Sequence, residues 1–497
     1  MRRSDAERIL LVLLGITSCS TVLLVLRCSR HIDELDVLTP ELNQPVSKRL
    51  AGRDKAGESS LWSDVTARNM VVQMTKEIRV EIEERKRPNV TSAGHNGTGF
   101  DHMLDFVQRA AISLVDPVSY NNEFEVVPFT RFALDRAYPV DPGLGRRVVE
   151  KPIGYRKREM RRVIEHAINS IIRQTGRKFS ASNFIEGIYR VVPGIGTQYE
   201  LYFRDRMQYR KVVVALPNLL PFVVSEELVP VHKETVHMIV ALSQRVDAFQ
   251  QFLQRFYRLV AQDNSVDLTV VYFGHAGLER VQSLVRDFNA DEESDSKVHL
   301  LTTNDTFSRG HGLQIGADSL NNNSLLLMCD VDIVLTSSFL ERCRLHTSLG
   351  RSVYYPIVFS LYNPAIVAKL QHTTKSPDKP IITRDTGFWR DFGYGMTCQY
   401  RADFLDVGGF TDEVVSNQSL AGWGMEDVRL YRKHLNSGTL TVVRATDPGI
   451  FHIWHEKSCP SSLSKDQYKG CLRSRALSEA SHAQLGMLLL EQKQTEK

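Results

Sequence analysis

The chain has little in its composition that assigns it to a class. Its seven cysteines show none of the paired spacings of zinc fingers, which excludes that kind of small metal-stabilised domain. Its net charge is only +4, a balance typical of an ordinary mixed surface, and we expect no nucleic-acid partner. The pattern Asp-x-Asp occurs only once, at Asp330 and Asp332. What is present is an average globular composition, 42% hydrophobic and 24% charged, in 497 residues, which is enough for two or three domains.

The single Asp-x-Asp lies in an otherwise apolar run, residues 325–335. The run is short and rich in aliphatic and β-branched side chains, so it predicts one buried strand rather than a helix. Burying a bare carboxylate is costly, so we expect a divalent cation to compensate Asp330 and Asp332 at the end of that strand. Oxygen ligands suit Mg²⁺ or Mn²⁺, and such an ion also binds a diphosphate. This arrangement is typical of glycosyltransferases that use nucleotide sugars.

Downstream of this motif the chain resembles a known family. The resemblance rests on Gly408-Gly409-Phe410 and on residues 422–427, 451–456, 355–364 and 387–401. These segments are similar to the catalytic half of the animal chondroitin N-acetylgalactosaminyltransferases. The similarity runs from about residue 236 to about residue 489, is weaker over residues 100–230 and is absent before them. It implies a glycosyltransferase A-type catalytic domain.

The N-terminus carries one long uncharged segment, residues 9–26, with arginines on both sides of it. Its length is near the lower limit for a membrane-spanning helix. The poor cleavage site before Arg27 favours a retained signal anchor over a cleaved signal peptide. The charge balance and the resemblance imply a single-pass type II protein of the Golgi membrane, with its catalytic domain in the lumen. Glycosylation sequons agree with a luminal body; they begin at Asn89, Asn96, Asn304, Asn322 and Asn417.

We therefore expect five regions along the chain. They are a cytoplasmic tail (1–8), a transmembrane helix (9–26), a stem (27–99), a smaller N-terminal luminal α/β domain (100–231) and the catalytic domain (232–492). Apolar side chains recur at helical spacing over residues 65–87, which indicates either a coiled coil that forms a homodimer or a partly helical spacer. In the N-terminal domain we expect a helix over residues 156–174 and a β-hairpin over residues 187–203.

From residue 235 the pattern alternates between strands and helices. We expect strands at 237–242, 268–273 and 298–301, and helices at 246–260, 278–288 and 309–321. Such alternation predicts right-handed βαβ units around a mainly parallel, Rossmann-like sheet, in which ligands bind at the carboxyl ends of the strands. Pattern and resemblance therefore indicate the same α/β fold.

Five cysteines lie beyond the anchor region, and an odd number cannot all pair within one chain. Cys459 and Cys471 are the preferred disulfide because they are close in sequence. Cys329 lies inside the expected strand and is interpreted as a small core residue.

Aspartates and histidines are the candidates for the metal site. The resemblance implies that Asp332 is a direct ligand of Mn²⁺ or another divalent cation, and that Asp330 contacts the ribose or the metal, directly or through water. A further ligand is expected from His452 or His455, whose spacing gives one face of a helix but opposite faces of a strand. The resemblance favours His455, whereas for His452 we expect a hydrogen-bonded core position.

Glu426 and Asp427 are the candidates for acid-base chemistry. They begin an expected helix, where acidic residues are also favoured for purely structural reasons. The resemblance implies that Asp427 takes the proton from the acceptor hydroxyl and that Glu426 contacts the acceptor or donor sugar. Met425 stands where the family often has Gly. This difference bears on the backbone geometry expected at that position and not on the roles of the two carboxylates.

Arginines and tryptophans complete the expected site. Arg245 and Arg309 are candidate contacts of the UDP diphosphate, because guanidinium groups fit phosphate geometry; the alternative is an ordinary surface position. Trp423 and Trp389 are either platforms for sugar rings or core residues.

The resemblance implies transfer of N-acetylgalactosamine, with inversion, from UDP-GalNAc to the 4-hydroxyl of a terminal glucuronic acid, which gives a β-1,4 linkage. The acceptor would be the glucuronate-capped linkage tetrasaccharide on a proteoglycan core protein, or a growing chondroitin chain. Chondroitin polymerases resemble two such transferase units in tandem, so a single Asp-x-Asp argues for one donor site. Two alternatives stay open: a non-catalytic partner subunit of a chondroitin synthase, and an enzyme like the β-1,4-galactosyltransferases.

Overall fold

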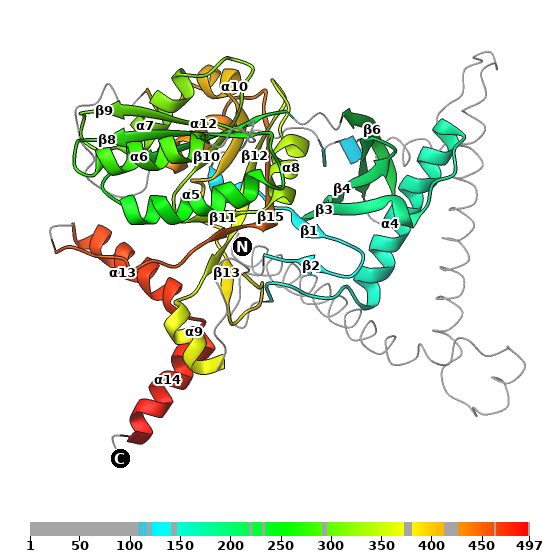
Figure 1. The fold of residues 1–497 in the computed structure, drawn as a ribbon. Coiled ribbons are helices and arrows are strands. Elements are labelled where there is room, and N and C mark those ends of the chain that lie inside the picture. The colour runs from blue at the N-terminus through cyan, green and yellow to red at the C-terminus, as the bar shows by residue number, and fades with distance from the viewer. Residues whose placement is uncertain are drawn as a thin grey trace, which may run out of the picture. The chain divides into compact units, whose positions relative to one another are not determined.

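The computed structural model describes residues 109–495 apart from residues 110, 113, 116–119, 121, 141–146, 218–220, 231–233, 291–295, 372–379, 412–425 and 462–463. The expected tail, anchor and stem, the helical pattern at 65–87 and Trp423 lie outside the described residues. Within the described part of the chain, no helix combines the length and the apolar character needed to cross a membrane. The described residues belong to one compact unit, Gly97–Lys497, which contains two sheets (Figure 1).

The first sheet has six strands in the order β2-β1-β3-β4-β5-β6, and all neighbouring strands are antiparallel. The strands are β1 (Thr130–Phe132), β2 (Ala137–Tyr138), β3 (Phe184–Val192), β4 (Gly196–Asp205), β5 (Gln208–Leu216) and β6 (Phe222–Pro230), and the helical segments are η3 (Glu123–Glu125), η4 (Ala181–Asn183) and α4 (Gly154–Thr175). The hairpin of β3 and β4 and the helix α4 confirm the two elements expected here. The pairing is wholly antiparallel, so this part of the chain is organised as α+β rather than as the expected α/β.

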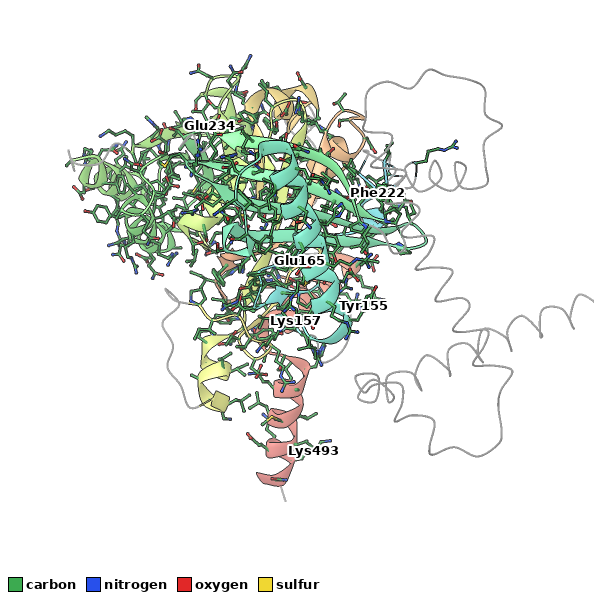
Figure 2. The ribbon with its side chains drawn as sticks, turned by 90° about the vertical axis from the view of Figure 1, so that its right-hand side faces the viewer. Tyr155, Lys157, Glu165, Phe222, Glu234 and Lys493 are labelled. Atoms are coloured by element: carbon green, nitrogen blue, oxygen red, sulfur yellow. A yellow bond between two sulfur atoms is a disulfide. The ribbon has the colours of Figure 1, made fainter. Side chains whose placement is uncertain are left out.

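Helix α4 packs on one face of the six-stranded sheet. Its buried apolar side chains, from Met160 to Ile171, recur every three or four residues and pack against the sheet. Tyr155, Lys157 and Glu165 lie on the exposed side of the helix (Figure 2). The helix thus covers one face of the sheet and leaves the other face to pack elsewhere.

The second sheet has nine strands in the order β11-β15-β12-β14-β10-β7-β8-β9, with β13 paired to β12. The strands are β7 (Val236–Leu242), β8 (Val266–Phe273), β9 (Val298–Thr303), β10 (Leu325–Cys329), β11 (Ile333–Leu335), β12 (Ser352–Leu361), β13 (Gly387–Trp389), β14 (Thr397–Tyr400) and β15 (Thr441–His452). The helices are α5 (Val246–Val260), α6 (Leu278–Asn289), α7 (Arg309–Asp318), α8 (Ser337–His346), α9 (Pro364–Gln371), α10 (Arg401–Asp406), α12 (Glu426–Leu435), α13 (Lys465–Glu479) and α14 (His482–Thr495). The three strands and three helices expected before the Asp-x-Asp are confirmed, with shifts of a few residues at some ends.

The expectation of a mainly parallel sheet is wrong, because the sheet is mixed. β10, β7, β8 and β9 form a parallel half, and β12 is parallel to β15. β14 is antiparallel to both β10 and β12, β11 is antiparallel to β15, and β13 is antiparallel to β12. Hydrophobic periodicity identifies a strand but does not give the direction of the strand beside it. Parallel neighbours need a crossover connection, usually a helix, and no helix lies between β13 and β14.

The apolar run 325–335 forms two strands rather than the single strand that we expected. β10 ends at Cys329, β11 begins at Ile333, and both aspartates lie in the turn between them. β10 pairs with β7 and β14, whereas β11 pairs with β15 at the far side of the sheet. The carboxylates are therefore at the carboxyl end of a strand, as expected, but they also mark the point where the chain moves to a new neighbour.

Helices cover both faces of the nine-stranded sheet (Figure 1). On one face, α5 and α6 pack against alternate residues of β7 and β8, such as Met238 and Val270. On the other face, α7, α10 and α12 pack against residues such as Ile239 and Leu326. This arrangement leaves the carboxyl ends of β7 and β10 as the place where a site can form.

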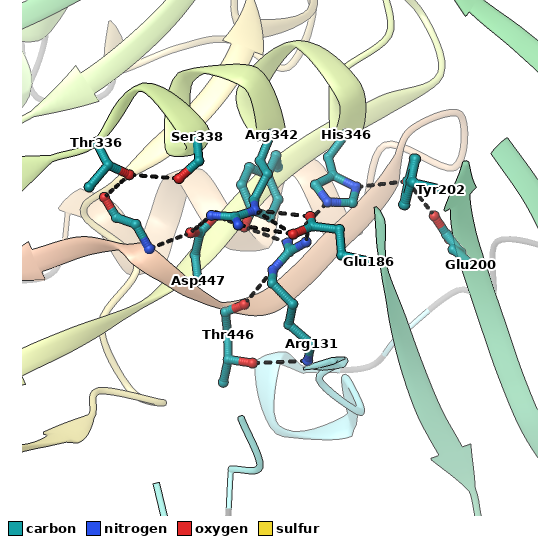
Figure 3. A network of polar contacts seen from close by, with 12 residues as sticks. Arg131, Glu186, Glu200, Tyr202, Thr336, Ser338, Arg342, His346, Thr446 and Asp447 are labelled. Carbon is teal, nitrogen blue, oxygen red and sulfur yellow. Dashed lines mark hydrogen bonds and ion pairs between the residues drawn. The ribbon is translucent and has the colours of Figure 1, made fainter. Parts of the chain in front are cut away.

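A buried network of charges joins the two sheets (Figure 3). Arg131 of β1 and Arg342 of α8 both form ion pairs with Glu186 of β3, and Arg342 also contacts Asp447 of β15 at 2.7 Å. Burial acts against ionisation of Glu186, but the charges of Arg131 and Arg342 outweigh it and lower the pKa of this carboxyl to about 2. Two arginines and two carboxylates balance, so the network can be buried while fully charged.

His346 of α8 extends this network as a neutral side chain. Burial, reinforced by the nearby charge of Arg131, holds the pKa of His346 well below its ordinary value. Its Nε2 faces an Arg131 nitrogen at 3.1 Å, and its Nδ1 lies 3.0 Å from the Tyr202 hydroxyl. Because arginine can only donate, Nε2 accepts and Nδ1 carries the proton.

The cysteines agree with the sequence analysis. Cys459 and Cys471 form the expected disulfide, and a second one joins Cys343 of α8 to Cys398 of β14. Among the described cysteines, Cys329 is free and buried in the core, as expected.

Candidate active site

Each aspartate of the Asp-x-Asp turn forms an ion pair with one of the two arginines expected at the site. Arg245 binds both carboxylate oxygens of Asp332, at 2.9 and 2.8 Å. The Arg309 Nε atom donates to Asp330 at 2.7 Å. The structure thus brings Arg245, Arg309, Asp330 and Asp332 together, while their contacts with UDP stay predictions.

A sharp turn after β7 positions Arg245. Gln244 has a φ of 60°, which is uncommon for a residue with a side chain. Arg245 follows as the residue before the first turn of α5, and its side chain reaches back to the Asp-x-Asp turn. A strained residue at the end of a strand is a common feature of functional sites.

Arg309 begins α7, and glycines allow this helix to approach the sheet closely. A Cβ atom on Gly316 would lie 2.3 Å from the Ile239 side chain, and one on Gly312 would lie 2.6 Å from Ala241. Burial acts to lower the pKa of Arg309, but the charge of Asp330, with smaller contributions from Glu426 and Asp427, raises it overall. Arg309 is therefore a permanent cation among three acids.

The pairing of β11 with β15 brings two histidines to Asp332. Ile333 lies opposite His452 in this pairing, and the Ile453 N–H donates to the Asp332 carbonyl at 2.8 Å. Ligand atoms of Asp332, His452 and His455 all lie within 4.8 Å of one another, and His455 Nε2 is 3.5 Å from Asp332 Oδ2. These three residues can therefore share one metal ion.

His452 belongs to this group, although we expected it in the core. The strand ends at His452, so the alternation that would separate His452 from His455 stops there. Burial and the neighbouring charge of Arg390 hold the pKa of His452 well below its ordinary value, and a metal ligand must be neutral. Among the described residues, the candidate metal group consists of Asp332, His452 and His455, and Asp330 forms an ion pair with Arg309 instead.

The donor set fits a divalent transition metal. A carboxylate oxygen suits Mg²⁺ and Mn²⁺ alike, whereas two imidazoles favour a transition metal over Mg²⁺ or Ca²⁺. Of the two ions considered from the sequence, Mn²⁺ is therefore the better match to Asp332, His452 and His455.

Glu426 and Asp427 lie in the first turn of α12, as expected. Glu426 is 3.8 Å from the Arg309 guanidinium, and Asp427 accepts from the Val428 N–H at 2.8 Å. Arg309 thus links Asp330 to the start of α12. The structure therefore places Glu426, and with it the first turn of α12, beside the arginine that binds the Asp-x-Asp turn.

Trp389 is a core residue, and the alternative of a sugar platform is wrong for it. Its side chain is 3% exposed, packs against Phe359 and donates its Nε1–H to the Val148 carbonyl at 2.8 Å. A ring enclosed on all sides offers no face to a sugar.

Sequence reasoning missed Ser360 and Arg390 beside the site. Ser360 of β12 pairs with His452, and its Oγ lies 3.4 Å from His452 Nδ1. Arg390 donates to the same Oγ at 2.8 Å. Strand alternation could have identified Arg390: it directly follows the buried Trp389, so its side chain points to the opposite face of the sheet from Trp389.

By fold and site the chain has the features expected of a glycosyltransferase: a mixed α/β sheet, a candidate metal group at the carboxyl ends of its strands, and arginines and carboxylates around that group. Comparison with known proteins identifies the particular family. The family model described as "Chondroitin N-acetylgalactosaminyltransferase" matches residues 65–485, and the chain belongs to this family.

The relatives cover most of the chain. It is 39% identical to chondroitin sulfate N-acetylgalactosaminyltransferase 2 of Mus musculus over 446 residues, 84% of this chain and 80% of that protein. It is 36% identical to chondroitin sulfate N-acetylgalactosaminyltransferase 1 of Homo sapiens over 508 residues, 97% of this chain and 94% of that protein. Among solved structures, a mannosyltransferase from Pyrobaculum calidifontis in complex with GDP-Man and Mn²⁺ covers 50% of this chain and 63% of its own, with 13% identity and a TM-score of 0.32. That last similarity is too distant to carry an argument.

Proposed function

We propose that this protein transfers N-acetylgalactosamine from UDP-GalNAc to the 4-hydroxyl of a terminal glucuronic acid, with inversion, in the synthesis of chondroitin chains. Membership of the family and the names of the relatives support the reaction class. The observation that carries the proposal is the convergence of Asp332, His452 and His455 beside the ion pair of Asp330 with Arg309. We assign the catalytic part, from about residue 232, to the glycosyltransferase A type.

Asp332, His452 and His455 would hold Mn²⁺, and Asp330 would bind the ribose or the metal. A bound Mn²⁺ would act as a Lewis acid that offsets negative charge on the UDP leaving group. Arg245 already occupies both oxygens of Asp332, so a cation would compete with it for that carboxylate. Once displaced, the Arg245 guanidinium is free to bind the diphosphate.

Asp427 would act as the general base. Its carboxylate can accept the proton of the acceptor 4-hydroxyl while that oxygen attacks the anomeric carbon. A single displacement on the α-linked donor inverts the configuration and gives the β-1,4 product. Arg309 and Glu426 would orient the donor or acceptor sugar beside this carboxylate, so that catalysis depends on positioning and on fixed charges.

The cellular context is part of the same proposal. The acceptor would be the glucuronate-capped linkage tetrasaccharide of a proteoglycan core protein or a growing chondroitin chain. The protein would lie in the Golgi membrane as a single-pass type II protein with a luminal catalytic domain. It would act as a homodimer or beside a chondroitin synthase, to which part of the chain is also similar.

The test measures transfer by the purified full-length chain from UDP-GalNAc and UDP-Gal, with Mn²⁺ and a glucuronate-terminated oligosaccharide. We expect transfer from UDP-GalNAc that Asp332→Asn abolishes through loss of metal binding. Asp427→Asn should lower kcat by about 10²- to 10⁴-fold and leave metal binding unchanged. Asp247→Asn is the matched control, because Asp247 is 83% exposed and pairs only with Arg280 among the described residues.

Other outcomes would replace the proposal. Transfer from UDP-Gal alone would indicate an enzyme like the β-1,4-galactosyltransferases. A folded chain that binds the oligosaccharide but transfers no sugar would indicate a non-catalytic partner subunit.

A further inference from the structure

Arg390 lies beside the candidate metal group but comes from a different segment of the chain. It directly follows β13, where its N–H donates to the Val358 carbonyl at 2.9 Å. Phe388 pairs with Ser360 in β12, and Ser360 pairs with His452 in β15. Phe388, Arg390, Ser360 and His452 therefore share one face, opposite to the buried Trp389.

The guanidinium of Arg390 is partly buried without an acidic partner. Its Nε and one terminal nitrogen both donate to Ser360 Oγ, at 3.3 and 2.8 Å. Among the residues that the structure describes, no carboxylate forms an ion pair with it. Burial accordingly lowers the pKa of Arg390 despite the charge of Asp330, whereas the pKa values of Arg245 and Arg309 are raised. A partly desolvated cation of this kind is stabilised by an anion that arrives with a ligand.

Aromatic rings extend from Arg390 toward solvent. The rings of Phe388 and Phe392 stack on each other with their centroids 6.5 Å apart, and the guanidinium lies 5.9 and 5.7 Å from these two centroids. Tyr362 stacks on Phe388, and both are buried, whereas Phe392 is 48% exposed. An exposed ring next to a cation suits a ligand that has both an apolar face and a negative charge.

From these contacts we infer that Arg390 and Phe392 form the subsite for a hexuronic acid of the acceptor, with Arg390 binding its carboxylate and Phe392 contacting the face of its ring. This inference rests on the proposed function and identifies residues that would select the acceptor. The donor diphosphate is the other anion that could reach Arg390. The diphosphate is the weaker candidate, because Arg245 and the metal group are already available to bind its charge. It also has no apolar face that Phe392 could contact.

The test compares two acceptors that differ only at the carboxylate: a glucuronate-terminated oligosaccharide and the same molecule with that carboxylate reduced to a hydroxymethyl group. Arg390→Gln should raise the KM for the glucuronate acceptor by about 10- to 100-fold, the range expected for a lost charge-assisted hydrogen bond. It should leave the KM for the reduced acceptor and the affinity for UDP with Mn²⁺ unchanged. Phe392→Leu should raise the KM of both acceptors alike.

The controls separate recognition from damage to the fold. Arg384→Gln removes an arginine that is 73% exposed just before β13 and should change neither acceptor preference nor UDP affinity. Arg390→Lys keeps the charge but not the guanidinium fork, so its preference for glucuronate should fall between those of the wild-type and Arg390→Gln. All variants should give the wild-type circular dichroism spectrum.

Three results would overturn the inference. Weaker UDP binding by Arg390→Gln with an unchanged acceptor preference would make Arg390 a diphosphate contact. An equal loss with both acceptors would give it a structural role. If the wild-type transfers sugar to neither acceptor, the proposed function fails, and direct binding of the glucuronate oligosaccharide to wild-type and Arg390→Gln still decides the inference: equal affinities reject it.

Discussion

Replacing Glu186 by Gln tests whether the buried charge network holds the two sheets together. The substitution keeps the shape of the side chain but removes the charge that faces Arg131 and Arg342. The pKa of Glu186 falls from its ordinary value of 4.5 to about 2 in the folded protein. At about 1.4 kcal/mol per pKa unit, this difference corresponds to about 3 kcal/mol of stability at neutral pH. Breaking one member of a buried ion pair costs about 3–5 kcal/mol, which gives the same order of magnitude.

The dependence on pH has a definite sign. A carboxyl whose pKa is lowered by folding stabilises the protein above its unfolded pKa, and this stabilisation is lost as the pH falls through its folded pKa. The stability difference between wild-type and Glu186→Gln should therefore be complete above about pH 4.5 and should shrink as the pH falls toward 2.

Chemical denaturation at several pH values measures this effect. The matched control is Glu165→Gln, on the exposed side of α4, which should change the free energy of unfolding by less than about 0.5 kcal/mol. A Glu186→Gln protein as stable as the control at pH 7 would refute the reasoning, as would a stability difference that does not depend on pH.

Three further substitutions test the candidate metal group and the core position of Trp389. His452→Ala and His455→Ala should each weaken Mn²⁺ binding by at least about 10-fold, measured by titration of the metal. His299→Ala, at an exposed position on β9, is the control. Unchanged Mn²⁺ affinity in His452→Ala would show that His452 is a core residue and not a ligand. Trp389→Phe should destabilise the fold by about 1–3 kcal/mol, because it leaves the Val148 carbonyl without its hydrogen-bond donor. It should not change the KM for the sugar nucleotide or the acceptor. An altered acceptor KM with normal stability would instead support a sugar platform.

The local pattern of apolar and polar residues was sufficient to predict those elements that depend on side chains close together in the sequence. α5 was predicted with its observed bounds, Val246–Val260, because its apolar residues recur at helical spacing and one face must be buried. The hairpin of β3 and β4 followed from alternation around a Pro-Gly turn. The Asp-x-Asp pair was recognised because two acids in an apolar run need a compensating partner.

Contacts between distant segments were not accessible in this way. The direction of β14, the burial of Trp389 and the position of Arg390 each depend on a neighbouring strand that the periodicity does not specify. The same is true of Asp447, which meets Arg342 across more than a hundred residues of chain.

Sequence pattern and resemblance were enough to predict most of the described helices and strands, the family, and two of the three members of the candidate metal group, Asp332 and His455. That His452 joins them follows from tertiary contacts alone, because the pairing of β11 with β15 brings the end of β15 next to the Asp-x-Asp turn. The physical reason is that a helix or strand follows from side chains a few residues apart, whereas a site requires strands far apart in sequence to pair in one register.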